Sequence, residues 1–480
     1  MRLMKSRLIL LFMLLMGLHC TLRAQNFESK FEINHHWLLV DSLLKNGLDK
    51  SANLEMNRIY QSSKTTQPDL TNFIRALFYK ANQALKLDSP VGFLGELQQE
   101  LRGSKTPHQQ IINSIIAGVH YQYYQKNRWK IDQRTSIKSD TTTNIQNWSK
   151  DDFYKKISTH FRASLQRADS LNQYYFTDEV FLIEDSLNRE YSPSLYDILA
   201  FRAIKCYVEL GAESLNIYKS LSADEKEKFF APTNIFLAYK FNQQDEDLRL
   251  SALQVFQSLI NLHSKNQNTA ALVYADLQRI KYARAAFYPA EKFDQQYIET
   301  LLNLANKYEA NQSVSRIYYE IAQTYINRGN KYDHYLRSEY QWEIKKGLEY
   351  VQIAVQKYPN TSVAKACMEL IESIKKPQFE LTIKSVELPD QPILSSLNYT
   401  NLDRIYLKLI PVAYLKNENN NRNSEEQKIK NLLNLPVFDE WKVELPNEGD
   451  FQSHNVQIRI HDVPKGYYAL LVSSGISFDS

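Results

Sequence analysis

The spacing of apolar residues divides the chain into two regions with different periods. Between residues 31 and 376, apolar residues recur three and four positions apart, which is the period of an amphipathic helix. After Pro377 the period changes to two, because apolar and polar residues alternate through residues 379–383. The pattern therefore predicts an array of helices followed by a β-domain.

Helix starts in the first region are marked by residues that satisfy free backbone N–H groups. Ser149–Asp152 and Ser222–Glu225 have the spacing of a capping box, in which a hydroxyl and a carboxylate three residues later cap each other's backbone. Three further starts are predicted where a hydroxyl residue precedes a proline at the first helical position: Ser89-Pro90, Thr106-Pro107 and Ser192-Pro193.

Part of the helical region has the pattern of tetratricopeptide repeats. Ser315–Gly329 alternates small and aromatic residues like the first helix of such a unit, and Gly347–Pro359 matches the second helix. Ala252–Leu259 is a weaker copy. Because the copies are irregularly spaced, the sequence predicts a degenerate array of helical pairs, with an ordinary helical domain as the alternative.

The second region, residues 377–480, is predicted to be a β-sandwich of short strands. Ile405–Ile410 and Val456–Ile460 show clear alternation, whereas Lys416–Lys428 is rich in asparagine and is expected to be an exposed loop. The sequence stops just after an apolar run within Val463–Ser480. We therefore expect the sandwich to be incomplete and the chain to be the front of a longer protein.

The first 24 residues have the features of a secretory signal peptide. Three basic residues precede the apolar run Leu8–Met16, which is too short to span a bilayer. Cleavage after Ala24 is favoured over lipidation at Cys20, because His19 stands where a small residue is expected before a lipidated cysteine. The expected organisation is a signal peptide at 1–24, a helical domain at 25–376 and a β-sandwich at 377–480. The mature protein is expected in the periplasm, at the outer membrane or outside the cell.

Charge and cysteine content narrow the functional classes. The formal net charge of +4 equals the number of basic residues in the leader, which has no acid, so the remainder is neutral. A neutral chain without a basic block gives no electrostatic reason to expect nucleic-acid binding. The mature chain would keep Cys206 and Cys367, each in an apolar helical pattern, and two buried thiols are favoured over a disulfide.

The order of these regions resembles the start of the large bacterial α-macroglobulin family, in the form common in Bacteroidetes. Three stretches carry the resemblance: Trp37–Ala52, Tyr191–Ala203, and the series from Phe379 through Ile405–Lys408 to Pro464–Ser473. The resemblance implies an exported protein in which a helical, repeat-like region leads into a series of macroglobulin β-sandwiches. It also implies a protease trap, that is, an endopeptidase inhibitor with proteases or other envelope proteins as partners.

The bait segment and the thioester of such traps are not expected within this chain. The nearest match to the Cys-x-Glu-Gln thioester motif is Cys367–Leu370, but Leu370 replaces the glutamine that supplies the acyl group. We interpret this segment as helix core. The helical region would then dock or position the trap.

No catalytic, cofactor-binding or metal-binding residue is predicted, so the chain is not expected to be an enzyme or to carry a cofactor. Neighbouring His35 and His36 would point about 100° apart on a helix, and no further ligands complete a metal shell. The acidic pairs at 151–152 and 245–247 are interpreted as solvated charge at helix ends or in loops. The tyrosine clusters at 121–124 and 174–176 could form a carbohydrate platform, but packing in a helical core is favoured.

Two alternatives from other functional classes stay open. The first is a glycan-binding outer-membrane protein of the SusD type, which Cys20 and surface aromatic residues would suit and the terminal β-domain would not. The second is a scaffold of the tetratricopeptide type that docks other proteins in a helical groove.

Overall fold

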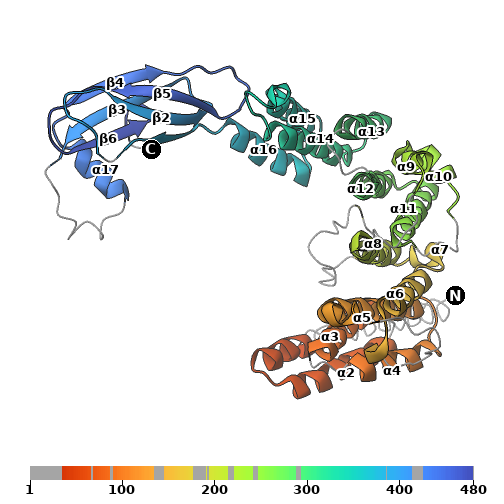
Figure 1. The fold of residues 1–480 in the computed structure, drawn as a ribbon. Helices are drawn as coiled ribbons and strands as arrows, with labels where there is room; N and C mark the ends of the chain where they lie inside the picture. The colour runs from red at the N-terminus through yellow and green to blue at the C-terminus, as the bar shows by residue number, and fades with distance from the viewer. Residues whose placement is uncertain are drawn as a thin grey trace, which may run out of the picture. The chain divides into compact units, whose positions relative to one another are not determined.

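The computed structural model describes residues 35–65, 69–86, 90–134, 145–176, 191, 194–213, 221–241, 247–287, 293–384, 386–412 and 425–478. The expected signal peptide and Cys20 lie outside these ranges. A helical array is followed by a small domain of two three-stranded antiparallel sheets, which confirms the predicted fold class (Figure 1). The chain forms two compact units, Met1–Pro289 and Ala290–Ser480.

The first unit consists of helices. Residues 35–45 are helical and are followed by α2 (Asp49–Thr65), α3 (Leu70–Lys86), α4 (Pro90–Leu101), α5 (His108–Ile131), α6 (Lys150–Ser164), α7 (Ala168–Leu171), α8 (Leu195–Glu213), α9 (Ala223–Phe230), α10 (Thr233–Ala238), α11 (Leu248–Lys265) and α12 (Thr269–Phe287). Aromatic side chains hold neighbouring helices together. Tyr123 and Tyr124 of α5, for example, pack on Phe153 of α6, with ring centroids 6.0 and 5.7 Å apart.

The predicted helix starts have different outcomes. Both capping boxes are present, and α4 begins at Pro90 as expected. The prediction for Thr106-Pro107 is wrong by one residue, because the Pro107 carbonyl itself accepts from the Gln110 and Ile111 N–H groups and Pro107 becomes the cap. Ser192-Pro193 lies outside the described residues, and α8 begins later, at Leu195.

The second unit begins with four helices: α13 (Asp294–Lys307), α14 (Val314–Gly329), α15 (Glu343–Lys357) and α16 (Ser362–Lys375). The predicted repeat-like pair corresponds to α14 and α15. The two helices approach closely at glycines, because a Cβ added to Gly329 would lie 2.5 Å from Ile344 Cγ1 and one added to Gly347 would lie 2.8 Å from Ile326 Cγ1. Both positions therefore require the absence of a side chain.

The β-domain follows within the same unit. Its strands are β1 (Gln378–Thr382), β2 (Ile393–Thr400), β3 (Arg404–Pro411), β4 (Asp439–Glu444), β5 (His454–Ile460) and β6 (Tyr468–Ser473). One sheet has the order β1-β2-β5 and the other β4-β3-β6, with every pair antiparallel. Their inner faces share a core that contains Leu397, Tyr399, Leu407 and Ile458.

The change from helix to strand falls between the end of α16 at Lys375 and the start of β1 at Gln378, where the period changes. The prediction of a loop through Lys416–Lys428 is wrong at its end, because α17 (Glu425–Leu433) begins inside it. This helix follows polar asparagines and has only nine residues, too few to establish a helical period in the sequence.

Candidate functional site at the junction of helices and sheets

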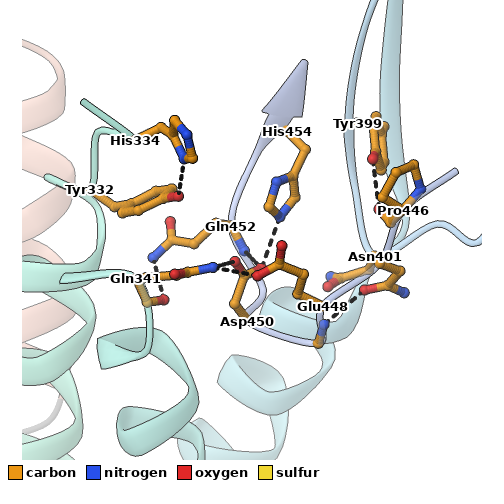
Figure 2. A network of polar contacts seen from close by, with 12 residues as sticks. Tyr332, His334, Gln341, Tyr399, Asn401, Pro446, Glu448, Asp450, Gln452 and His454 are labelled. Carbon is orange, nitrogen blue, oxygen red and sulfur yellow. Dashed lines mark hydrogen bonds and ion pairs between the residues drawn. The ribbon is translucent and has the colours of Figure 1, made fainter. Parts of the chain in front are cut away.

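A cluster of hydrogen-bonded polar residues lies where the α14–α15 pair meets the β-sandwich. Residues 330–342, between α14 and α15, face residues 445–453, between β4 and β5 (Figure 2). Hydrogen bonds across this junction join residues more than 100 positions apart in the sequence. We call the cluster the junction, and its central residues are Gln341, Asp450 and Gln452.

Gln452 caps the end of a helix from the sandwich side. Its Nε2 donates to the carbonyl oxygen of Gly329, at 3.2 Å, and to that of Gln341, at 3.1 Å. The last carbonyls of a helix have no partner within the helix, and that of Gly329 also accepts from the Tyr332 N–H at 2.9 Å. Gln452 therefore adds a second donor there and supplies a donor to the Gln341 carbonyl, which would be costly to bury unpaired. Gln452 is 6% exposed, which places these bonds away from solvent.

Asp450 organises the sandwich side of the junction. Its Oδ1 accepts from the Gln452 N–H and from His454 Nε2, both at 3.0 Å, and its Oδ2 accepts from Gln341 Nε2 at 3.0 Å. Burial raises the pKa of Asp450, but the hydrogen bonds from Gln452, His454 and Gln341 outweigh it, so the net pKa lies below its usual value. The carboxylate therefore stays charged and holds the loop to the helices.

The backbone of this loop is held in an uncommon conformation. Gly449 and Phe451 have φ angles of 70° and 62°, in the left-handed region, and phenylalanine adopts this region at a cost of about 1–2 kcal/mol. The intervening Asp450 is 1% exposed. Its three donors therefore offset strain in the turn that contains it.

A second contact fixes the start of the sandwich. Asn401, with a φ of 57°, donates from Nδ2 to the carbonyl oxygens of Ile374, at 2.6 Å, and Lys376, at 3.2 Å. It thereby caps the C-terminal end of α16. In the same domain, Tyr399 donates to the Pro446 carbonyl oxygen at 2.6 Å (Figure 2). The polar residues of the junction thus have a positioning role. They donate to backbone carbonyls at helix ends and hold the sandwich loops against the helices.

The first unit contains hydrolase residue types in a different arrangement. Ser194 donates from Oγ to Asp197 Oδ2 at 2.6 Å, and Asp197 Oδ1 lies 2.7 Å from His263 Nε2. In a nucleophilic triad the serine would instead contact the histidine. All three side chains are buried. They cap α8 and tie it to α11, a role that could have been recognised from the Ser-x-x-Asp spacing at 194–197.

A buried ion pair forms another polar connection. Arg279 and Asp276 of α12 are both fully buried, and Arg279 Nε donates to Asp276 Oδ1 at 2.7 Å. Arg279 also donates to the carbonyl oxygens of Phe229 and Ala231, and Asp276 accepts from Thr233 Oγ1 at 2.7 Å. The pair fixes the turn between α9 and α10. The sequence analysis missed it because both charges occur in an otherwise ordinary helical pattern.

The histidines and cysteines singled out in the sequence lie on helices. His35 and His36 lie on the first helix, and His36 contacts the buried carboxylate of Glu55. In the described part of the chain, no group of three or more histidine, cysteine or acidic residues could hold a metal ion. Cys206 and Cys367 are both buried, as expected, and burial raises the pKa of the Cys367 thiol to about 11.

Two interpretations of acidic and aromatic clusters need correction. Asp247 is 4% exposed and caps α11 while paired with Arg249 at 2.6 Å, so it is not solvated charge. Tyr123 and Tyr124 belong to the core, as favoured. Tyr175, however, is 59% exposed and lies outside a helix, where its backbone bridges to Ser194. Short aromatic runs do not define a period, which explains the error.

No family model matches the chain, and no curated protein sequence is similar enough to count as a relative. Among the described residues, no helix is both long enough and apolar enough to cross a membrane.

Proposed function

We propose that this chain is a non-catalytic part of an exported protein of the α-macroglobulin type, an endopeptidase inhibitor. In this proposal the helical array is the docking and positioning region, and the sandwich is the first macroglobulin-like domain. The observation that supports it is the order of helical pairs and sandwich, joined by the Gln452–Asp450 junction. A trap needs its domains held in defined geometry, and hydrogen bonds that hold the sandwich to the α14–α15 pair would serve that need.

The absence of enzymatic activity is part of the proposal. The hydrogen bonds of the buried serine, aspartate and histidine at 194, 197 and 263 cap α8 and connect it to α11. Asp450 accepts three hydrogen bonds that position the sandwich loop. Both constellations are thus occupied by structural tasks.

The test measures how the whole gene product changes the activity of a protease on substrates of different size. A protease incubated with that product should lose activity on a large protein substrate and keep activity on a small chromogenic peptide. With residues 25–480 alone, the protease should keep its activity on both substrates. Equal loss on both substrates would indicate a conventional active-site inhibitor, and no loss on either would rule out the trap.

A second candidate, docking of a partner protein, is favoured by one ordered turn. Tyr335 and Leu336 are 88% and 83% exposed, yet their N–H groups both donate to Asp333 Oδ1, at 2.9 and 2.8 Å. A preformed turn loses little entropy when its aromatic tip binds. If this turn is a docking point, Tyr335→Ala should abolish capture of the partner without changing the melting temperature. Val386→Ala, at a residue that is 83% exposed, is the control and should leave capture intact.

A further inference from the structure

Basic residues gather in the first unit where α5 ends and α6 begins. The described residues 126–134 and 150–156 contain seven lysines and arginines but three aspartates, a formal net charge of +4, although the chain after its leader is neutral. We call this region the basic end. Its cations are Lys126, Arg128, Lys130, Arg134, Lys150, Lys155 and Lys156. Because the two stretches are separated in the sequence, they do not appear there as one basic block.

The fold brings the two stretches together. Helices α5 and α6 pack side by side (Figure 1). The ring of Tyr124, near the end of α5, contacts that of Tyr154, near the start of α6, with centroids 5.6 Å apart. Just beyond α5, Arg134 Nη1 donates to the carbonyl oxygen of Trp148 at 2.9 Å, immediately before α6. The end of α5 and the start of α6 therefore form one surface region.

The acids of the basic end do not cancel its positive charge. Asp132 pairs with Arg128 at 3.3 Å, and Asp152 belongs to the capping box of α6, whereas Asp151 is exposed. Arg134 donates to a backbone carbonyl, which has no net charge and so does not neutralise the guanidinium. The region therefore keeps an excess of positive charge at the protein surface, where it attracts anions.

An exposed tryptophan lies among these cations. Trp129, near the end of α5, is 67% exposed, and Lys130 Nζ lies 5.3 Å from the centroid of its ring. Exposure of so much apolar ring surface to water is unfavourable. At a membrane surface, in contrast, tryptophan is enriched, because its ring sits at the level of the lipid headgroups. Trp129 thus adds an interfacial side chain to a positively charged surface.

We propose that the basic end binds the surface of an anionic lipid bilayer, with its lysines and arginines near the lipid phosphates and Trp129 in the interface. Each lysine or arginine close to such a surface strengthens binding about fivefold. The cations are spread along two helices, and a bilayer surface, which presents many mobile anionic headgroups, can meet such a spread without a fixed pocket. The proposal goes beyond the proposed function and does not depend on it.

Co-sedimentation with lipid vesicles tests the binding. The probes are vesicles of phosphatidylcholine alone and vesicles that also contain about 30% phosphatidylglycerol, which is anionic. Residues 25–480 are used, so that the apolar leader does not itself bind lipid. We expect the protein to sediment with the anionic vesicles at about 50 mM NaCl and to be released at about 500 mM, because salt screens charge. It should not sediment with the neutral vesicles.

Paired lysine substitutions test the charge of the basic end. Lys130→Gln combined with Lys155→Gln removes two exposed cations and should weaken binding to the anionic vesicles about 30-fold. Lys45→Gln combined with Lys50→Gln removes the same total charge from exposed positions outside the basic end and is the matched control. It should leave binding unchanged. Melting temperatures equal to that of the wild type establish that both variants are folded.

Tryptophan fluorescence tests the contact of Trp129 with lipid. Anionic vesicles should shift the emission of the wild type to shorter wavelength, and Trp129→Ala should remove this shift and weaken binding. Leu54→Ala, at a leucine of α2 that is 66% exposed, is the control and should change neither.

Three results would overturn the proposal: no sedimentation with anionic vesicles at low salt, equal sedimentation with neutral vesicles, or a Trp129→Ala variant that binds like the wild type. Binding to polyglutamate as tight as binding to vesicles, without an emission shift, would also overturn it and indicate an acidic protein as the partner.

Discussion

One buried and one partly buried histidine predict that the first unit loses stability in mild acid. His120 of α5 and His160 of α6 have ring centroids 5.7 Å apart, and His120 packs on Trp148 at 5.0 Å. Burial lowers the pKa of His120 to about 3, with further contributions from His160 and Lys156. Burial and Lys156 lower the pKa of His160 to about 4. Both imidazoles are therefore neutral in the folded protein at pH 5.

The sign follows from comparison with the unfolded chain, where histidine has its ordinary pKa of 6.5. Between pH 6.5 and about 4, the unfolded chain binds protons that the folded chain does not, so acid favours unfolding. The stability is complete above pH 6.5 and falls as the pH is lowered. At about 1.4 kcal/mol per pH unit, each histidine costs about 2 kcal/mol at pH 5, and the pair about 4 kcal/mol.

Urea unfolding between pH 5 and 7.5, followed by tryptophan fluorescence, measures this dependence. His120→Phe keeps a ring in the core and removes one proton site, so its free energy of unfolding should fall less steeply with acid, by about 1.4 kcal/mol per pH unit. Ile116→Val, at a buried aliphatic position of α5, should lower stability without changing the slope. Equal slopes for His120→Phe and the wild type would refute the reasoning.

Three further substitutions and reactions have defined outcomes. Gly329→Ala should lower the free energy of unfolding by about 1–3 kcal/mol in urea, because its Cβ would meet Ile344, whereas Gly95→Ala in open space should be neutral or stabilising. Asp276→Asn should cost about 3–5 kcal/mol by leaving buried Arg279 without its counter-charge, and a loss below 1 kcal/mol would contradict that role. Cys367, with its raised pKa, should react with a disulfide reagent at pH 8 only after unfolding, and rapid reaction in the native protein would contradict its burial.

The sequence predicted features that depend on local spacing. The α14–α15 pair, both capping boxes and the strands around 405–410 and 456–460 follow from apolar period and capping residues close together in the chain. Strands β2 and β4 were not singled out. In β2, Ser395 is buried by donating to the Ile458 carbonyl at 3.2 Å, so a polar residue occupies a core-facing position.

The junction could not have been predicted from the sequence in the same way. Gln452 and Gly329 are separated by 123 positions, and neither belongs to a recognisable motif. The sequence around Asp450 is that of an ordinary loop and does not indicate that its carboxylate accepts from Gln341, 109 positions away. The available signal was Gly449, because a glycine between polar residues indicates a turn with left-handed backbone.

The central claim is that the junction makes the α14–α15 pair and the sandwich a single mechanical piece, and hydrogen exchange after Gln452→Ala tests it most directly. Loss of this amide leaves the Gln341 carbonyl without its donor and the Gly329 carbonyl with the Tyr332 N–H alone, at a cost of about 1–3 kcal/mol, or about 5- to 150-fold faster exchange. Gln457→Ala removes the same type of side chain from an exposed position of the following strand, β5, and serves as the control.

The account predicts that exchange accelerates together in the end of α14, the start of α15 and β5, and that Gln457→Ala changes none of them. Acceleration confined to residues 450–454, with both helices protected as in the wild type, would contradict the claim.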